Sequence, residues 1–272
     1  MALLVPAARN QRGDRNYSGT PTTTWGTTLT GGTSHNLPAS PTELVASTAF
    51  EAEWIRIEFH GMFVAATRPD ALGNNYTGPR ASETLFIDSL QAGWSNTVAN
   101  AGVGQVYWFP VRIPSGTRIS ASLRSLIASD TCYIKIDYGV SNGAFWVGSG
   151  VETLGEVTAS SRGTAVTPGN AAEGSWATIG TTGQRWRYLA LGVQGNNDTT
   201  ANAGLLAWDV GTGSAIYQGM ENLTTFMNSN EYVQRNDADR WCDIPSGTSL
   251  QVRANAHAAV SGLTYATLHG VY

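Results

Sequence analysis

The stretch Ile113-Pro114-Ser115-Gly116-Thr117 occurs a second time in this chain, as Ile244-Pro245-Ser246-Gly247-Thr248. Pro114 has no N–H to donate to a neighbouring strand, so it is expected to end one strand. Gly116 can supply the positive φ of a tight turn, and Thr117 opens the next strand. The motif therefore predicts a strand–turn–strand unit at two places, offset by 131 residues.

The hydrophobic pattern around the two motifs follows the same offset. Residues 55–59 and 119–123 alternate apolar and polar side chains, and residues 250–254 do the same. In the second half Trp186, Tyr188 and Ala190 take the places of Ile55, Ile57 and Phe59, with Leu189 at the position of Glu58. Such alternation is typical of half-buried strands. Together with the repeated motif it predicts an internal duplication that gives two copies of one β domain. Identities on this diagonal are Gly32-Thr33 with Gly163-Thr164, Ala46 with Ala177, Arg56 with Arg187, and Gly61 with Gly192.

Length and composition favour two β domains. A chain of 272 residues allows two domains that each bury a core of their own. Gly, Thr, Ser, Asn and Trp are abundant and only 13% of residues are charged, which is typical of short strands joined by many turns. We predict an all-β fold of two tandem antiparallel β-sandwich domains, jelly-roll-like in topology. The predicted units are an N-terminal arm (1–20), repeat one (21–140), a linker (141–153) and repeat two (154–272).

Between these strands the sequence predicts loops and one linker. Residues 68–79 are predicted as a loop with a turn at Gly73-Asn74-Asn75, and residues 91–104 as a polar loop around Trp94. Phe145 and Trp146 interrupt the Gly-rich linker, so we expect them to pack into the crevice between the domains. For residues 224–230 the sequence does not decide between a short helix and an irregular segment.

Charge and cysteine usage exclude several classes of protein. A net charge of −4, with Lys135 as the only lysine, argues against a nucleic-acid-binding surface. Cys132 and Cys242 have no Cys or His partner at metal-ligand spacing, so we expect buried free thiols and neither a metal nor another cofactor. The apolar residues 1–6 are fewer than a signal peptide needs, and no stretch approaches the length of a membrane span. We therefore expect synthesis in a cytoplasm.

No constellation of residues predicts catalysis. Glu51, Glu53 and Glu58 lie close in sequence, but the alternation places Glu58 on a solvated sheet face rather than across a cleft from a second carboxylate. Ser149 lacks the strand-to-helix elbow that exposes a nucleophile. Residues 236–239 lack the glycine and distal glutamate of a calcium loop. We expect a protein that is not an enzyme. The histidines, scattered without ligand spacing, are His35, His60, His257 and His269.

Aromatic and amide side chains in predicted loops indicate binding instead. An exposed tryptophan stacks on a sugar ring while nearby Asn and Asp side chains bond its hydroxyls. The chain has nine tryptophans, and some fall in predicted loops. The alternative, which we favour, is that these aromatics fill contacts between domains or subunits. The glycan-binding candidates are Trp94, Asn74, Asn75, Tyr76, Asn196, Asn197 and Asp198.

The segment Phe109-Pro110-Val111-Arg112-Ile113-Pro114-Ser115-Gly116-Thr117-Arg118-Ile119-Ser120-Ala121 resembles one that recurs in proteins of tailed bacteriophages and phage-like gene transfer agents. The shorter segment 243–248 is similar. The likeness covers one motif per repeat and brings no functional residues with it. It implies a structural virion protein on the head or tail surface: a capsid decoration, head spike, head fibre or tail fibre. Such proteins are usually homo-oligomers, often trimers, and several bind host glycans.

The resemblance also implies partners. These are further copies of the chain, other virion proteins such as capsid or tail proteins, and host surface polysaccharide. From the charge and the short apolar stretches we expect neither nucleic acid as a partner nor membrane insertion. The N-terminal arm is expected to dock on the particle through Arg9, Arg12 and Arg15, which pair with acidic neighbours. One alternative is a free, lectin-like carbohydrate-binding protein. A third is a polysaccharide-degrading enzyme.

Overall fold

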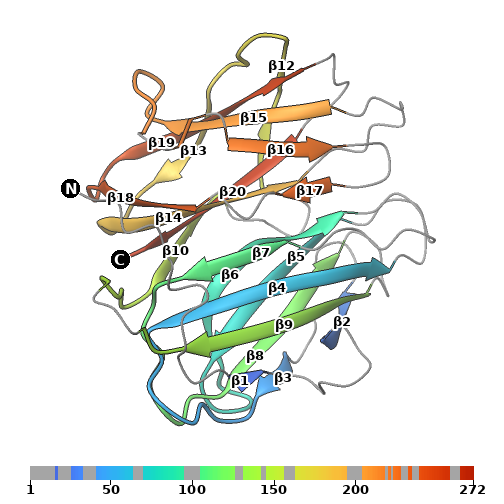
Figure 1. Ribbon diagram of the computed structural model, residues 1–272, viewed down its shortest axis with the longest axis vertical. Helices are drawn as coiled ribbons and strands as arrows, with labels where there is room; N and C mark the ends of the chain where they lie inside the picture. The colour runs from blue at the N-terminus through green and yellow to red at the C-terminus, as the bar shows by residue number, and fades with distance from the viewer. Residues whose placement is uncertain are drawn as a thin grey trace.

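The computed structural model describes residues 16–17, 26–32, 41–63, 70–94, 105–125, 131–141, 145–155, 163–194, 204–217, 220–221, 223–227, 232–234, 239–257 and 264–272. Every regular element in these ranges is a β-strand, so the predicted all-β fold is confirmed. Figure 1 shows two bodies stacked along the long axis, one built from residues up to 139 and the other from residue 151 onward. Across the described ranges, no helix is long and apolar enough to span a membrane.

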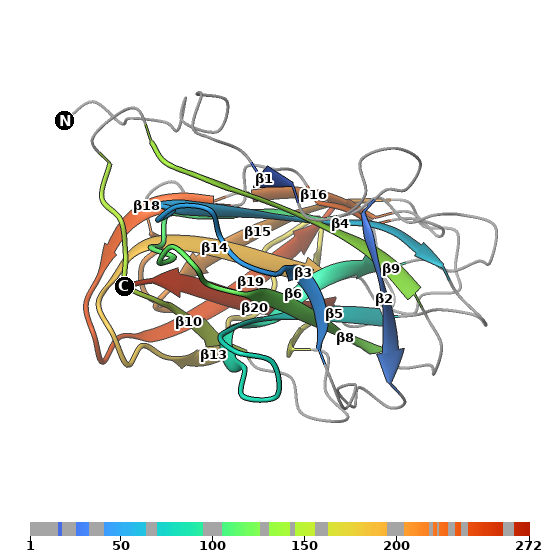
Figure 2. The same cartoon turned by 90° about the horizontal axis from the view of Figure 1, so that it is seen from below.

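The first half is one sheet folded into two layers. One layer contains β1 (Asn16–Tyr17), β2 (Thr27–Gly32), β9 (Thr131–Gly139), β4 (Trp54–Phe63) and β7 (Val106–Phe109); the other contains β6 (Thr84–Trp94), β5 (Asp70–Thr77), β8 (Ile119–Ser125) and β3 (Thr42–Val45). Strand β2 joins the layers, because it pairs antiparallel with β9 and then parallel with β8. Figure 2 shows β2 crossing from one layer to the other. The apolar members of residues 55–59 and 119–123 are fully buried in the core between the layers, as predicted.

The second half consists of two sheets. The first has β10 (Val151–Leu154), β20 (Thr264–Val271), β14 (Trp186–Gln194) and β18 (Asp239–Ile244) in that order, with β11 (Thr164–Val166) also on β20. The second has β12 (Gly169–Asn170), β19 (Ser249–Ala256), β15 (Gly204–Gly211), β16 (Leu223–Met227) and β17 (Tyr232–Gln234), with β13 (Ala177–Thr181) also on β19. Trp186, Trp208 and Met220 are fully buried between them.

The strand pairings of the two halves correspond. Antiparallel pairs β4–β9, β4–β7, β5–β8 and β5–β6 have the counterparts β14–β20, β14–β18, β15–β19 and β15–β16. The parallel pair β2–β8 has the counterpart β12–β19. Both β3–β8 and β13–β19 shift register at one place, between Glu43 and Val45 and between Thr178 and Gly180. A common origin of the halves by duplication stays a prediction.

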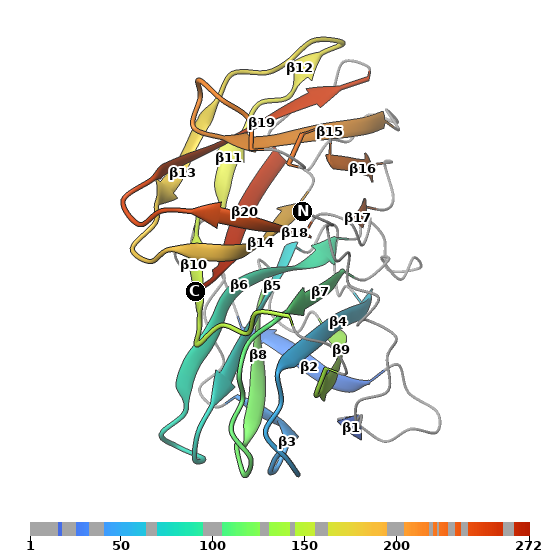
Figure 3. The ribbon, with the colours of Figure 1, turned by 60° about the vertical axis from the view of Figure 1, so that its left-hand side comes forward.

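The halves share a buried junction. Tyr188, Ala190 and Val271, from the second half, belong to the core of the first half, whereas the core of the second half draws on residues 166–268 alone. Figure 3 shows β6 and β7 lying against the sheet that contains β10, β14 and β20. The second half therefore completes the hydrophobic core of the first.

Aromatic rings lie along the same junction. The Phe145 ring centroid is 5.6 Å from that of Trp108 in the first half and 6.2 Å from that of Trp241 in the second. Trp146 lies 6.5 Å from Trp241 and keeps 39% of its surface exposed. Trp108 also contacts Tyr188, at 5.5 Å. The segment between the halves is thus held by ring contacts on both sides.

Three local predictions are wrong. Residues 70–77 form strand β5 rather than a loop, and β6 continues through residues 91–94. Gly73 does not mark a turn; a Cβ at this position would overlap the ring of Phe59, so the close approach of two strands requires the glycine. Residues 223–227 form strand β16, which is neither the short helix nor the irregular segment that the sequence left open for residues 224–230.

The environment of Glu58 also differs from the prediction. This carboxylate is only 8% exposed rather than solvated. It forms ion pairs with Arg56 and with Lys135, the latter at 3.5 Å. The alternation places Glu58 on the polar face correctly, but the neighbouring cations cover it.

Candidate functional site

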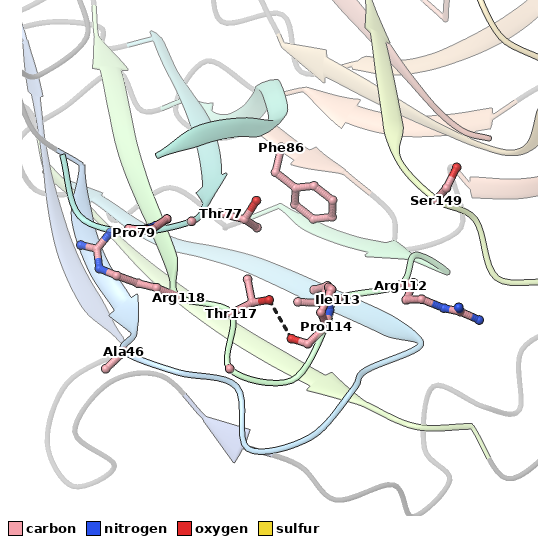
Figure 4. Close-up of a pocket in the computed structure, with 12 residues that line it drawn as sticks. Ala46, Thr77, Pro79, Phe86, Arg112, Ile113, Pro114, Thr117, Arg118 and Ser149 are labelled. Carbon is pink, nitrogen blue, oxygen red and sulfur yellow. Dashed lines mark hydrogen bonds between the residues drawn. The ribbon is translucent and has the colours of Figure 1, made fainter. Parts of the chain in front are cut away.

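A pocket of about 630 Å³ opens at the end of the first half, within the size range of small-molecule sites. It lies where the end of the β5–β6 hairpin, the turn of the first Pro-Ser-Gly-Thr motif and the segment leading to the second half meet (Figure 4). Its walls come from chain segments that are far apart in the sequence. The lining residues are Ala46, Thr77, Gly78, Pro79, Phe86, Arg112, Ile113, Pro114, Gly116, Thr117, Arg118 and Ser149.

One wall is the Pro-Ser-Gly-Thr turn, which Thr48 holds from behind. The Thr48 hydroxyl donates to the Pro114 carbonyl at 2.7 Å and accepts from the Thr117 N–H at 3.0 Å. The Gly116 N–H donates to the Thr48 carbonyl at 2.8 Å. Gly116 has a φ of 79°, as the motif predicts. This bonding makes the turn a fixed wall rather than a loose loop.

The apolar part of the pocket centres on Phe86. Figure 4 shows its ring directed into the space between the turn and Ser149. Phe86 is half-buried and packs on the core, while its neighbour Leu85 is 45% exposed and does not line the pocket. Pro79 and Pro114 extend the apolar surface on either side. An aromatic ring is therefore fixed at its base and accessible at its face.

Arg118 is the more deeply placed of the two arginines in the lining. Its guanidinium bonds Glu43 at 2.8 Å and Glu83 at 2.6 Å. These bonds raise the pKa of Arg118. The pKa of the Glu83 carboxyl is lowered, first by a hydrogen bond from the Glu83 backbone N–H and then by the bond from Arg118. Two carboxylates compensate the charge of this guanidinium, which connects the residue before β8 to β3 through Glu43 and to the residue before β6 through Glu83.

Arg112 is placed differently. Its side chain is 63% exposed, and its Nε is 3.6 Å from Oε1 of Glu51, which is itself 57% exposed. Figure 4 shows its side chain on the same side of the pocket as Ser149, extending outward from Phe86 and the turn. Ser149 bonds the Tyr272 carbonyl through its N–H at 2.6 Å and its hydroxyl at 3.1 Å. This rim offers guanidinium and hydroxyl groups at the edge of an apolar floor.

The pocket is suited to binding. Its lining contains hydroxyl, guanidinium and apolar side chains, and none of its residues is a Cys, His, Asp or Glu. In the part of the chain that the structure describes, no group of three or more His, Cys, Asp or Glu side chains could hold a metal ion. Non-covalent capture of a small ligand needs only the groups that are present.

The predicted glycan-binding residues do not meet in this pocket. Asn74 and Asn75 are fully buried in β5, and the Asn74 side chain accepts from the Ser89 N–H at 3.1 Å, so the prediction that they form a ligand-binding loop is wrong. Tyr76 is half-buried in the same strand, with its hydroxyl 3.1 Å from Ser122 Oγ. Trp94 ends β6. Outside the described residues lie Asn196, Asn197, Asp198, Arg9, Arg12 and Arg15.

Sequence reasoning missed the residues that line the pocket. Phe86 is predicted only as part of a short apolar strand, and Ser149 is considered only as a nucleophile. Arg112 directly precedes the repeated motif, and this position was the one sequence feature that could have indicated a role in the pocket. The contribution of Phe86 and Ser149 depends on segments that come together only in the folded chain.

Neither a protein-family model nor a curated protein sequence matches this chain. Among solved structures, it is similar to "Structure of PNGF-II in P21 space group" at 8% identity and a TM-score of 0.32, covering 94% of this chain and 65% of that one. It is also similar to the N-terminal CBM22-1-CBM22-2 tandem domain from Paenibacillus barcinonensis Xyn10C, at 10% identity and a TM-score of 0.27, covering 96% and 98%. A third is Broad Bean Stain Virus, at 8% identity and a TM-score of 0.28, covering 92% of each chain. These likenesses are compatible with carbohydrate binding and with a virion role, and carry no argument for either.

Proposed function

We propose that this chain is a non-enzymatic binding protein whose pocket beside the first Pro-Ser-Gly-Thr turn holds a saccharide. The observation that supports it most directly is the Phe86 ring, which faces a pocket that Arg112 and Ser149 also line (Figure 4). The C–H face of a sugar ring packs on an aromatic ring, and its hydroxyls bond serine hydroxyls and guanidinium groups at the edge. The fixed turn keeps the cost of ordering the site low.

The test is a glycan array on the full chain, followed by calorimetry on the best ligand with two neighbouring variants. Phe86→Ala removes the ring and is expected to weaken binding by about tenfold or more, in line with the loss of a buried aromatic contact. Leu85→Ala, next in sequence but outside the pocket, is the matched control and is expected to bind as the wild type. Equal affinity of all three proteins, with circular dichroism unchanged, would contradict the proposal.

We further propose that the protein is carried on the surface of a tailed phage or phage-like particle as a decoration, spike or fibre. The resemblance of residues 109–121 to segments of such proteins supports this placement. Homo-oligomerisation and docking of the arm through Arg9, Arg12 and Arg15 belong to the same proposal. Mass spectrometry and cryo-electron microscopy of purified particles test it. Presence on the shell or tail is the expected result, and absence from particles would favour the free lectin-like protein.

A further inference from the structure

The second half supplies an internal reference for the pocket. Its Pro-Ser-Gly-Thr turn is held by Thr182 as the first is by Thr48. The Thr182 hydroxyl donates to the Pro245 carbonyl at 2.8 Å and accepts from the Thr248 N–H at 3.0 Å. The Gly247 N–H donates to the Thr182 carbonyl at 2.7 Å, and its φ is 81°. The residues around the two turns can therefore be compared position by position.

That comparison shows an ion pair with its charges exchanged. In the first half, Arg112 precedes the turn and Glu51 lies three residues after the clamping threonine. In the second half, Asp243 precedes the turn and Arg185 lies three residues after the clamping threonine. In the first half the cation, Arg112, thus lies on the chain segment that leads into the motif. In the second half the cation, Arg185, lies on the segment that follows the clamping threonine. Arg112 is also one of the residues that line the pocket.

The two pairs also differ in closeness. Arg185 grips Asp243 with two bonds of 2.7 Å and 2.6 Å, which lowers the pKa of Asp243. Arg112 and Glu51 are 3.6 Å apart, beyond hydrogen-bond distance, and both side chains are mostly exposed. A planar guanidinium with this loose partner keeps donors for a second carboxylate. Arg118, the other arginine of the lining, has its charge taken up by Glu43 and Glu83.

We infer that the saccharide held in the pocket is acidic, with a carboxylate on its ring that Arg112 binds while the ring packs on Phe86. This inference rests on the proposed function and names the ligand class of the same site. Arg112 is then the residue that determines specificity. Ser149, on the same side of the pocket, is placed for a hydroxyl next to the carboxylate (Figure 4). Glu51 competes with the ligand for the guanidinium.

The experiment is calorimetry of the full chain with a hexuronic acid oligosaccharide and with its carboxyl-reduced counterpart, in which a neutral hydroxymethyl group replaces each carboxylate. The wild type is expected to bind the acidic form about tenfold more tightly, as a charge-assisted bond predicts, and to lose that margin in high salt. Arg112→Gln is expected to equalise the two ligands. Glu51→Gln is expected to strengthen the acidic one severalfold. Arg185→Gln, at the exchanged pair, is the control and is expected to change neither.

Each outcome decides a different point. Equal binding of both oligosaccharides by the wild type, or a preserved preference in Arg112→Gln, overturns the inference and leaves saccharide binding standing. Binding of neither oligosaccharide, together with an empty glycan array, overturns the proposed function and the inference with it. Circular dichroism and melting temperatures of the variants confirm that each is folded; Arg112 is mostly exposed, so its replacement by Gln is expected to be tolerated.

Discussion

The two halves of this protein share a frame and differ in what they place on it. Both pair their strands in the same order, and both hold a Pro-Ser-Gly-Thr turn with one buried threonine, Thr48 or Thr182. Before its turn the first half has Arg112, which lines the pocket, and the second half has Asp243, which is hydrogen-bonded to Arg185. Backbone hydrogen bonds and buried small residues thus fix the frame, while the exposed positions around it are open to new chemistry.

The cores differ in a second way. The first half borrows Tyr188, Ala190 and Val271 to close its core, and the second half closes its own. A half that depends on its neighbour for core residues is not expected to be stable alone, because large apolar surfaces of its core would meet water. We therefore expect the halves to unfold together, with the junction as a determinant of stability.

The largest expected effect is the response of the junction to acid. His269 is fully buried, with its ring nitrogens 3.1 Å from the hydroxyls of Thr153 and Thr267. Burial lowers its pKa from 6.5 to about 3. The unfolded chain takes up this proton below pH 6.5 and the folded chain does not, so stability is lost as pH falls from 6.5 towards 3. The loss reaches about 5 kcal/mol at the lower limit.

The measurement is the free energy of unfolding in urea, for the wild type and for His269→Gln, at several pH values from about 7.5 to about 4. The variant is expected to have a flatter profile, whatever its stability at neutral pH. Parallel profiles of the two proteins would show that other groups cause the acid sensitivity.

Truncation of matched core positions is expected to have the next largest effect. Ile55 in β4 and Leu189 in β14 occupy corresponding positions, because each pairs with both neighbouring strands at the same place, and both are fully buried. Ile55→Ala and Leu189→Ala are each expected to cost about 2–5 kcal/mol. Calorimetric melting should show one transition that both variants lower, because the junction couples the cores. Two transitions, each lowered by one variant, would mean that the halves unfold independently.

Removal of the turn clamps is expected to cost less, and to cost the same in both halves. Thr48→Val and Thr182→Val keep the shape of the side chain and remove the hydroxyl that bonds a carbonyl and an N–H of the turn. A loss of about 1–3 kcal/mol is expected at each site, because the turn loses two side-chain hydrogen bonds, while the Thr117 and Thr248 hydroxyls still donate to the Pro114 and Pro245 carbonyls. Unequal losses, measured by urea unfolding, would show that the two threonines contribute differently to the free energy of unfolding despite their similar hydrogen bonds.

The exchanged ion pairs are expected to have the smallest effect on stability. Arg185 and Asp243 are both about half exposed, as are Arg112 and Glu51. Exposed pairs contribute little to folding. Asp243→Asn and Glu51→Gln are therefore expected to melt at the wild-type temperature within the error of the measurement. A clear fall in the melting temperature of either variant would assign its pair a role in holding the turn.

The elements set by local periodicity could be predicted from the sequence, and those set by distant contacts could not. Residues 55–59 and 119–123 alternate in sequence because the apolar face of each strand meets the core, although Ser120 and Ser122 on the other face of β8 are buried as well. Strand β5 was missed because Gly73-Asn74-Asn75 has the composition of a turn. In the structure Gly73 is needed for another reason: a side chain there would overlap the ring of Phe59. The pocket joins Thr77, Phe86 and Ser149, which no local pattern relates.

The exchanged ion pair shows a further limit of sequence reading. The turns are offset by 131 residues, but the clamping threonines Thr48 and Thr182, and with them Glu51 and Arg185, are offset by 134. A single diagonal therefore misaligns the partners. The correspondence becomes visible only when hydrogen bonds, rather than residue numbers, relate the two halves.

The most direct test of the central claim is a chemical-shift map of the isotope-labelled protein titrated with a saccharide identified by the array. Saccharide binding at the pocket predicts shifts confined to residues near Thr77, Phe86, Arg112, Thr117 and Ser149, with the second turn at 244–248 unchanged. Shifts centred on the second half, or no saturable shifts with any saccharide, would contradict it.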